Sequence, residues 1–208
     1  MELWAHNHDN QEVPYIDSNS LWCPPGVSNM LFNSSARFGA ITIAIHWVSA
    51  VVIIGQFCTG LYMLSLDYYD PYYNVLPYYH KSIGILFAVL LFIRILWTAM
   101  NPRPVPAKGV SDREHKMALF THKTLLGLLV TVVVFGYLIS TADGSSIRVF
   151  NLFEVPATLS SANQEDWAGE LHYWFALSVI LLSGIHALAA LKHHFIDRNE
   201  TLVRMLGR

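Results

Sequence analysis

Four long stretches of apolar residues dominate the sequence. They run over residues 39–66, 80–100, 117–140 and 168–191, and the first contains no charged side chain. Each is about 20–28 residues long, which is enough to cross a lipid bilayer with some tilt. Backbone polar groups in lipid must be satisfied within their own segment, so we expect four helices. The alternating pattern of a transmembrane strand is absent. The pattern therefore predicts an all-α fold, a transmembrane four-helix bundle.

The connectors between these stretches differ in charge and predict an orientation. Connector 67–79 has two acidic and no basic residues, and connector 141–167 has one basic residue, Arg148, against four acidic ones. Connector 101–116 and the segment after residue 191 are basic. The positive-inside rule then places both termini and connector 101–116 in the cytoplasm, and the other two connectors outside. The basic residues are Arg103, Lys108, Arg113, Lys116, Lys192, Arg198, Arg204 and Arg208.

Composition narrows the class of protein further. The 208 residues are 53% hydrophobic and 13% charged, whereas soluble domains carry about 25% charged residues. This excludes a soluble enzyme and a disordered chain. The net charge of −2 offers no general basic surface, so we expect no nucleic-acid partner. Two cysteines cannot build a disulfide framework, and Cys58, inside an apolar run, is expected to be a small buried hydrophobe.

Residues 1–36 differ from the rest and predict a boundary between a polar N-terminal arm, 1–36, and a membrane domain, 37–208. The arm is acidic and interrupted by prolines, without the basic start and apolar stretch of a secretory signal peptide. It is either a flexible cytoplasmic segment or a docking segment for a partner protein. Leu21, Trp22 and the apolar run 30–32 are more hydrophobic than a solvated tail needs.

Five histidines fall in the apolar stretches, where a polar side chain is costly and usually functional. Any one of them alone is explained as well by a hydrogen bond to a neighbouring carbonyl. His172 and His186 are 14 residues apart, so on a helix they share a face and lie about 21 Å apart along the axis. The five are His46, His80, His122, His172 and His186.

Four of these histidines fall into two pairs when they are grouped by their expected depth in the membrane. His80 and His172 both lie near the outer ends of their spans, and His46 and His186 lie towards the inner ends. Zinc prefers four protein ligands, or three and a water, and no cysteine or carboxylate lies at either level. A haem needs only two axial ligands and suits an apolar cavity in a helix bundle. The sequence thus predicts two stacked haems with both axial positions filled, an arrangement for electron transfer.

Several motifs resemble the bacterial cytochrome b561 family over about residues 37–206. They begin with Arg37-Phe38 and AIHW at 44–47, and continue with HKSIG at 80–84, RILW at 94–97 and NPRP at 101–104. STADG at 140–144 and FNLF at 150–153 resemble an outer loop of that family. GIHALAALKHHF at 184–195 is the most distinctive stretch. The first 36 residues depart from the family pattern.

The resemblance implies a di-haem b-type cytochrome of the bacterial inner membrane, with two heme b groups. By this resemblance the axial, metal-binding ligands are His46, His80, His172 and His186. These are the same pairs that their depth in the membrane indicates. Members of the family exchange electrons with ubiquinone. One member resembles a superoxide oxidase, in which superoxide reduces the outer haem and quinone is reduced beyond the inner haem.

Other polar residues near the span ends are secondary candidates. Arg37, Lys81 and Arg94 are each placed to pair with a haem propionate, or to extend towards lipid headgroups. The resemblance suggests that His193 or His194 lies near bound quinone, where a histidine can pass on a proton; the alternative is a solvated interfacial pair.

His122 shows no obvious partner at its depth. It is expected to be a hydrogen-bonded core histidine or a neighbour of the quinone site.

Three functions fit these observations to different degrees. The first is an oxidoreductase that moves electrons between an outer donor and membrane quinone. The second is an electron-conducting or anchoring subunit of a larger respiratory or photosynthetic complex, which the N-terminal arm favours. The third, a histidine-lined metal transporter, is disfavoured because the histidines pair in two layers and no carboxylate lines a path.

Overall fold

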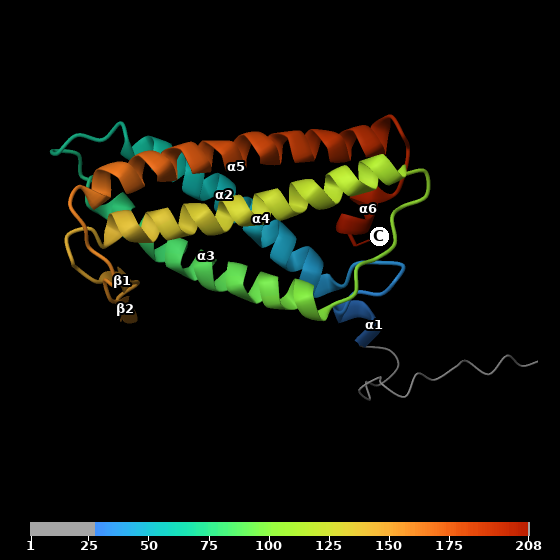
Figure 1. The fold of residues 1–208 in the computed structure, drawn as a ribbon, viewed down its shortest axis with the longest axis horizontal. Helices are drawn as coiled ribbons and strands as arrows, with labels where there is room; N and C mark the ends of the chain where they lie inside the picture. Colours follow the sequence, from blue (N-terminus) through green and yellow to red (C-terminus); the bar gives the residue numbers. More distant parts are fainter. Residues whose placement is uncertain (1–27, 208) are drawn as a thin grey trace, which may run out of the picture.

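The computed structural model describes residues 28–207, and these form a bundle of four long helices (Figure 1). The helices are α2 (Ala40–Met63), α3 (Val75–Met100), α4 (Asp112–Ser140) and α5 (Gln164–Phe195). Each is long and apolar enough to cross a membrane. The predicted all-α transmembrane four-helix bundle is confirmed. Leu21, Trp22 and the rest of 1–27 lie outside the described residues.

Three of the helices extend beyond the apolar stretches that predicted them. Helix α3 begins at Val75, α4 begins at Asp112, and α5 runs from Gln164 to Phe195. At the start of α4, Ser111 Oγ accepts from the Glu114 N–H, and the Glu114 carboxylate accepts from the Ser111 N–H. This capping box satisfies backbone donors outside the apolar stretch. Hydropathy therefore marks the part of each helix in lipid and not its polar ends.

The bundle packs around a small apolar core. Helices α4 and α5 lie side by side, α2 packs on α3, and α3 packs on α4 (Figure 1). Phe87 and Leu91 of α3 meet Leu129 of α4 and Val179 of α5 in a buried cluster.

The outward faces are apolar too, as lipid-facing surfaces are. Val51, Val89, Val134 and Leu181 are all exposed. The expectation for Cys58 was wrong, because its side chain is exposed on the surface of α2. In a membrane span both the interior and the lipid-facing side are hydrophobic, so an apolar run does not say which way a residue faces.

The two ends of the bundle are built differently. At one end, called the hairpin end, strands β1 (Ile147–Val149) and β2 (Phe153–Val155) pair antiparallel. The hairpin docks on α3, where Ser82 Oγ donates to the Arg148 carbonyl over 3.2 Å. This hairpin was not predicted, since three-residue strands leave almost no periodicity. The opposite end, called the α6 end, carries α1 (Ser28–Leu31), connector 101–111 and α6 (Thr201–Met205).

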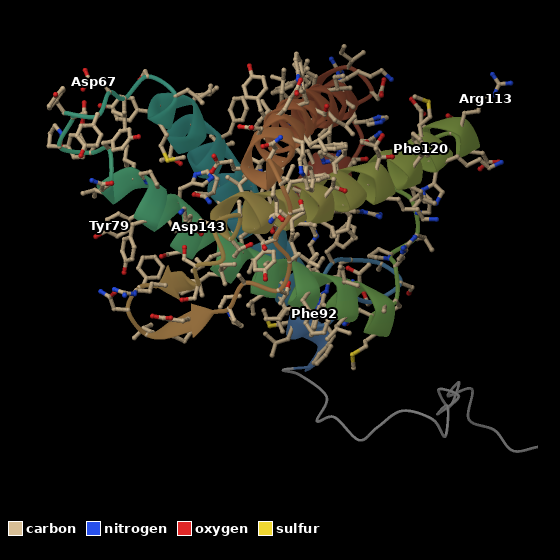
Figure 2. The ribbon with its side chains drawn as sticks, turned by 60° about the vertical axis from the view of Figure 1, so that its left-hand side comes forward. Asp67, Tyr79, Phe92, Arg113, Phe120 and Asp143 are labelled. Atoms are coloured by element: carbon tan, nitrogen blue, oxygen red, sulfur yellow. The ribbon has the colours of Figure 1, made fainter. Side chains whose placement is uncertain are left out.

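The two ends of the bundle also differ in the charge of their side chains. Figure 2 shows Asp67 and Tyr79 on one side of the molecule and Arg113 on the other. The first two belong to the hairpin end, and Arg113 lies in the first turn of α4 at the α6 end.

Hydrogen bonds join separate segments at the α6 end. The Asn33 Oδ1 accepts from the Gly39 N–H and the Thr42 hydroxyl, and its Nδ2 donates to the Pro102 carbonyl. Trp47 Nε1 donates to the carbonyl of Met205 over 2.8 Å. Residues 28–36, the described part of the predicted arm, therefore lie against the bundle. The arm boundary at residue 36 stays a prediction.

Gly39 is the position where this end tolerates no side chain. A Cβ there would overlap the backbone of Leu31 and Phe32, whereas Gly55, inside α2, has open space around it. We expect Gly39→Ala to cost about 1–3 kcal/mol, as overpacking does. Gly55→Ala should be neutral or stabilising, because alanine favours helix. Thermal unfolding of the two detergent-solubilised variants checks this, and equal midpoints would contradict it.

Candidate functional site

Four of the five span histidines form two facing pairs. His80 of α3 and His172 of α5 have ring centroids 6.3 Å apart, with ring planes at 74°. His46 of α2 and His186 of α5 have centroids 6.4 Å apart, with planes at 64°. The first is called the hairpin-end pair and the second the α6-end pair. The structure brings together the same residues that the depth argument grouped.

The spacing within each pair suits one metal centre between two imidazoles. With a metal–nitrogen bond of about 2 Å, two rings on opposite sides of one metal have centroids about 6 Å apart. Within residues 28–207, neither pair belongs to a group of three or more histidine, cysteine or carboxylate ligands that could hold a metal ion. Two nitrogens alone suit a haem, which supplies the other four ligands itself, better than zinc.

An apolar layer separates the two pairs. Val179 lies seven residues from His172 and seven from His186 on α5, and it belongs to the buried core cluster. Phe87 of the same cluster lies seven residues after His80 on α3. The pairs are thus stacked along the bundle, about 21 Å apart along α5.

Hydrogen bonds hold both rings of the hairpin-end pair. His172 Nδ1 lies 2.9 Å from the Val132 carbonyl oxygen, which can only accept, so the ring carries its proton on Nδ1. His80 Nδ1 lies 3.2 Å from Thr59 Oγ1. The Thr59 hydroxyl donates to the backbone carbonyls of its own helix, so its oxygen accepts from His80. Both Nε2 atoms therefore stay available as ligands.

Glycine makes room for these rings. A Cβ on Gly136 of α4 would lie 3.1 Å from His172 Cε1, and a Cβ on Gly60 would lie 3.6 Å from His80 Cε1. Gly127 and Gly184 have nothing within 4 Å of such a Cβ. A side chain on Gly136 would therefore press on the His172 ring, whereas one on Gly127 would meet nothing.

The α6-end pair has a third histidine beside it. His122 of α4 lies with its ring centroid 5.0 Å from that of His186, at 69°. The expectation that His122 has no partner at its depth was wrong. Its height along the span was readable from the sequence, but the rotation of α4 against α5 was not. At 5.0 Å the two rings are too close to bind one metal from opposite sides.

Arg94 brings a positive charge to the same pair. It is half-buried in α3 and interacts electrostatically with His46, His122 and His186. Among residues 28–207 no carboxylate forms an ion pair with it. Arg37 lies at the same end, just before α2, where its backbone bonds to Ser34.

Lys81 lies at the other end, on a polar cavity. The cavity measures about 620 Å³ and opens at the hairpin end. Its lining includes Lys81, Asp143, Ser145 and Arg148. The Ser145 hydroxyl and N–H both donate to Asp143, which lowers the pKa of this carboxyl below its ordinary value.

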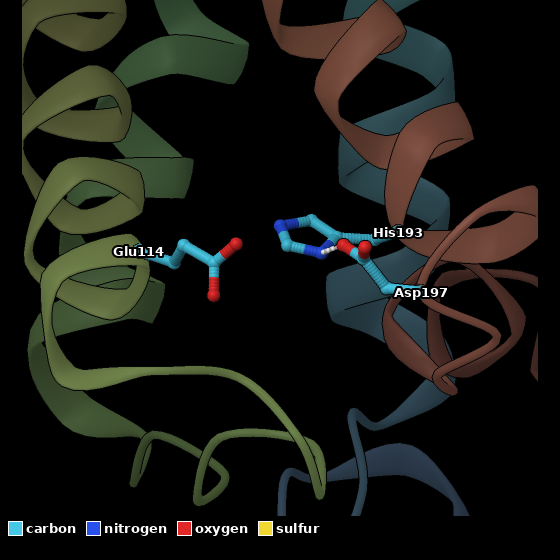
Figure 3. A group of neighbouring side chains, drawn as sticks. All are labelled: Glu114, His193 and Asp197. Atoms are coloured by element: carbon cyan, nitrogen blue, oxygen red, sulfur yellow. Dashed lines mark ion pairs between the residues drawn. The ribbon is translucent and has the colours of Figure 1, made fainter.

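His193 and His194 have different surroundings at the α6 end. His193 Nδ1 lies 2.8 Å from an Asp197 carboxylate oxygen (Figure 3), and Asn199 lies 3.3 Å from the same nitrogen. The His194 ring packs against Phe195, with centroids 4.8 Å apart.

Lys192 completes a charged cluster around His193. Its ammonium group lies 2.8 Å from Asp197 and 3.2 Å from Glu114, which reaches over from α4. The hydrogen bond from Lys192, joined by that from His193, lowers the pKa of Asp197 below its ordinary value. Glu114, His193 and Asp197 are close enough together for a metal ion. Because the lysine already supplies a cation to both carboxylates, this is an ion-pair network.

A membrane-spanning bundle with facing imidazoles in apolar surroundings defines the class of membrane cytochromes. The sequence model of a family described as prokaryotic cytochrome b561 matches residues 37–208. This chain belongs to the prokaryotic cytochrome b561 family. Membership implies a b-type haem, electron transport and a multi-pass protein of the inner membrane in contact with lipid.

Individual relatives agree with this assignment. "Cytochrome b561 homolog 2" of Escherichia coli K12 is 49% identical over 177 residues, covering 85% of this chain and 94% of that protein. "Probable superoxide oxidase CybB" of Yersinia pestis is 29% identical over 173 residues, covering 83% and 97%. "Cytochrome b562" of Cereibacter sphaeroides is 26% identical over 171 residues, covering 80% and 92%.

The two glycines of α4 give a matched test of the hairpin-end pair. We expect Gly136→Ala to displace His172 and reduce the low-spin haem signal, because the added methyl group presses on the ring. Gly127→Ala on the same helix should leave the spectrum unchanged. Absorption and electron paramagnetic resonance spectra of the purified variants report this. A normal spectrum for Gly136→Ala would show that the ring needs no such space.

Proposed function

We propose that the protein is a di-haem b-type cytochrome that carries electrons across the inner membrane from an outer donor, superoxide, to ubiquinone. The observation that supports this most strongly is the presence of two facing histidine pairs at two levels of one bundle. A single pair could hold a haem near only one face of the membrane, whereas two stacked pairs could pass an electron from one face to the other.

In this proposal His80 and His172 hold one haem and His46 and His186 hold the other. Each haem, when bound, supplies an iron that accepts and returns one electron. Two histidine ligands would leave a bound haem no open position for oxygen and would thereby favour electron transfer. The Val132 carbonyl and the Thr59 hydroxyl orient the hairpin-end rings.

The cationic side chains suit the anionic propionates of these groups. Arg94 stands beside the α6-end pair without a carboxylate partner among the described residues. A charge-assisted hydrogen bond to a propionate would offset the cost of its burial. Arg37 is a second candidate at that end, and Lys81 is the candidate at the hairpin end.

The charge of the two ends supports an orientation. The α6 end carries the basic connector between α3 and α4 and the basic chain after α5. By the positive-inside rule this end faces the cytoplasm, together with both termini. The hairpin end then faces outward, so His80 and His172 are the outer pair.

The cavity at the hairpin end offers access for a small anionic donor. Its lining contains the cations Lys81, the residue after the proposed ligand His80, and Arg148, which pairs with Glu154, together with the carboxylates Asp143 and Glu165. The case for an anion therefore rests on Lys81, the cation next to His80. Positive side chains at a cavity mouth attract an anion such as superoxide. The name of the Yersinia pestis relative, a probable superoxide oxidase, agrees with this donor.

The α6 end offers the groups that quinone reduction needs. Two superoxide anions lose one electron each to give two molecules of oxygen. One ubiquinone takes up those two electrons and two protons to become ubiquinol. Histidine is the side chain suited to passing on protons near neutral pH. His193, with Asp197 beside it, is well placed to do so, and His194 is the second candidate for contact with quinone.

An electron-conducting or anchoring subunit of a larger complex is the alternative function. Met30, Leu31 and Phe32 are exposed beside the α6 end, which favours a partner protein docking there through residues 1–36. In that case the isolated chain would react slowly with superoxide and would co-purify with a stoichiometric partner.

Single histidine substitutions test the assignment of ligands. We expect His46→Ala or His186→Ala to lose the inner haem and retain the outer one, because each pair serves one level. His80→Ala or His172→Ala should do the reverse. Haem content per chain and the spectra of the remaining haem measure this. Equal loss at both levels in every variant would contradict the pairing.

Rapid mixing tests the reaction itself. The oxidised protein, in detergent with ubiquinone, should be reduced by superoxide within the mixing experiment and should then form ubiquinol. Lys81→Gln should slow the superoxide step several-fold and flatten its dependence on ionic strength, because it removes steering charge. Lys123→Gln, on α4 outside this cavity, is the charge-matched control. Slow reduction of the isolated chain, with a partner bound in equal amount, would support the subunit alternative.

A further inference from the structure

We infer that Gln56 of α2 is a positioning residue for the hairpin-end pair, which holds His80 by its backbone while Thr59 holds the same residue by its ring. This inference deepens the proposed function and rests on it, because it requires a haem between His80 and His172. It is carried by two hydrogen bonds that join one face of α2 to a single residue of α3.

Gln56 places an amide inside the apolar stretch that contains no charged side chain. A polar side chain in a span is costly unless it has a partner, and glutamine in membrane bundles forms hydrogen bonds across helices. Gln56 is half-buried, and its Nε2 donates to the His80 carbonyl over 2.8 Å. The amide lies over Gly84, where an added Cβ would be 3.6 Å from Nε2. The partner of this amide is thus the backbone of a proposed haem ligand.

Three residues on one face of α2 meet His80. Gln56, Thr59 and Gly60 are three and four residues apart along the helix, so they point the same way. Thr59 Oγ1 lies 3.2 Å from His80 Nδ1, and a Cβ on Gly60 would lie 3.6 Å from Cε1 of that ring. A bond to the ring alone would leave the backbone of His80 free to shift. The second bond, from Gln56, fixes the place of the imidazole as well as its orientation.

The start of α3 explains why the backbone of His80 needs a bond from another helix. The helix begins at Val75, five residues before His80, and the side chain of its N-cap residue, Asn74, makes no capping hydrogen bond. Pro77, in the first turn, has no N–H to donate. Helix ends without caps fray. Gln56 therefore ties down a ligand-bearing segment that its own helix holds weakly.

The position of His80 sets the angle between the two ligand rings of the hairpin-end pair. The planes of His80 and His172 stand at 74° to each other, which is close to perpendicular. His172 has its own hydrogen bond to the Val132 carbonyl, so the angle depends on how firmly His80 is held. Outer hydrogen bonds of this kind fix the orientation of a ligating imidazole. Crossed imidazole planes give low-spin ferric haem a larger highest g value in electron paramagnetic resonance than parallel planes do.

Replacing the amide tests this role in the detergent-solubilised full chain. Gln56→Met keeps the length of the side chain and removes the donor. We expect two haems to remain, and the highest g value of the hairpin-end component to fall while its line broadens. The α6-end component should stay unchanged. His80→Ala and His46→Ala assign the two components. Thr59→Val should shift the same component as Gln56→Met, and Thr59→Ser, which keeps the hydroxyl, should leave it in place.

Gln164 provides the matched control. Its side chain is buried at the start of α5, and its Nε2 donates to the Leu138 carbonyl over 2.9 Å. It therefore also ties one helix to another, but among the described residues it bonds no histidine. Gln164→Met should lower the midpoint of thermal unfolding and leave both spectral components in place. Equal spectral changes in Gln56→Met and Gln164→Met would overturn the positioning role of Gln56.

The rate of haem release gives a second readout. Transfer of haem to added apomyoglobin should be several-fold faster from Gln56→Met than from the unaltered chain, and only for the hairpin-end haem. Should Gln56→Met fail to fold, Gln56→Asn, whose amide is one methylene short of the carbonyl, takes its place with the same expectations. An unchanged g value with unchanged haem release would overturn this inference alone. Fewer than two haems in the unaltered chain would overturn the proposed function as well.

Discussion

The structure depends on the cost of placing imidazoles inside an apolar bundle. Four histidines lie in helices that each carry a strongly apolar membrane-spanning window, and they face one another in two pairs. A polar ring in such surroundings is stable only when its nitrogens have partners. Val132 and Thr59 supply one partner to each ring of the hairpin-end pair. In our proposal the haem irons supply the partner on the other nitrogen.

The rest of the fold positions the two histidine pairs. Helix α5 contributes one histidine to each pair, so the 14-residue spacing of His172 and His186 along it sets the distance between the two levels. The apolar cluster around Val179 closes the bundle between them. At the ends, the hairpin docked on Ser82 and the hydrogen bonds of Asn33 join the connectors to the helices. These bonds fix the connectors against α2 and α3, the helices that supply His46 and His80.

Much of this was readable from the sequence because membranes impose simple rules. Four apolar stretches predicted four helices, and the spacing of His172 and His186 predicted two levels on one face. The features that the sequence did not predict depend on how each helix is rotated about its own axis. The sequence did not show that His122 lies against His186 or that Cys58 faces outward, because hydropathy in a span is alike on all sides. The hairpin at Ile147–Val155 was missed because its strands are too short for a pattern.

Electron transfer across the membrane requires both pairs to be filled at once, and this is the central claim. The most direct measurement is the number of b-type haems per chain in the purified protein, determined from the pyridine haemochrome spectrum against protein content. The account predicts two haems per chain, both low-spin with two histidine ligands. A single haem per chain, or a haem-free protein that binds zinc at these histidines, would contradict it.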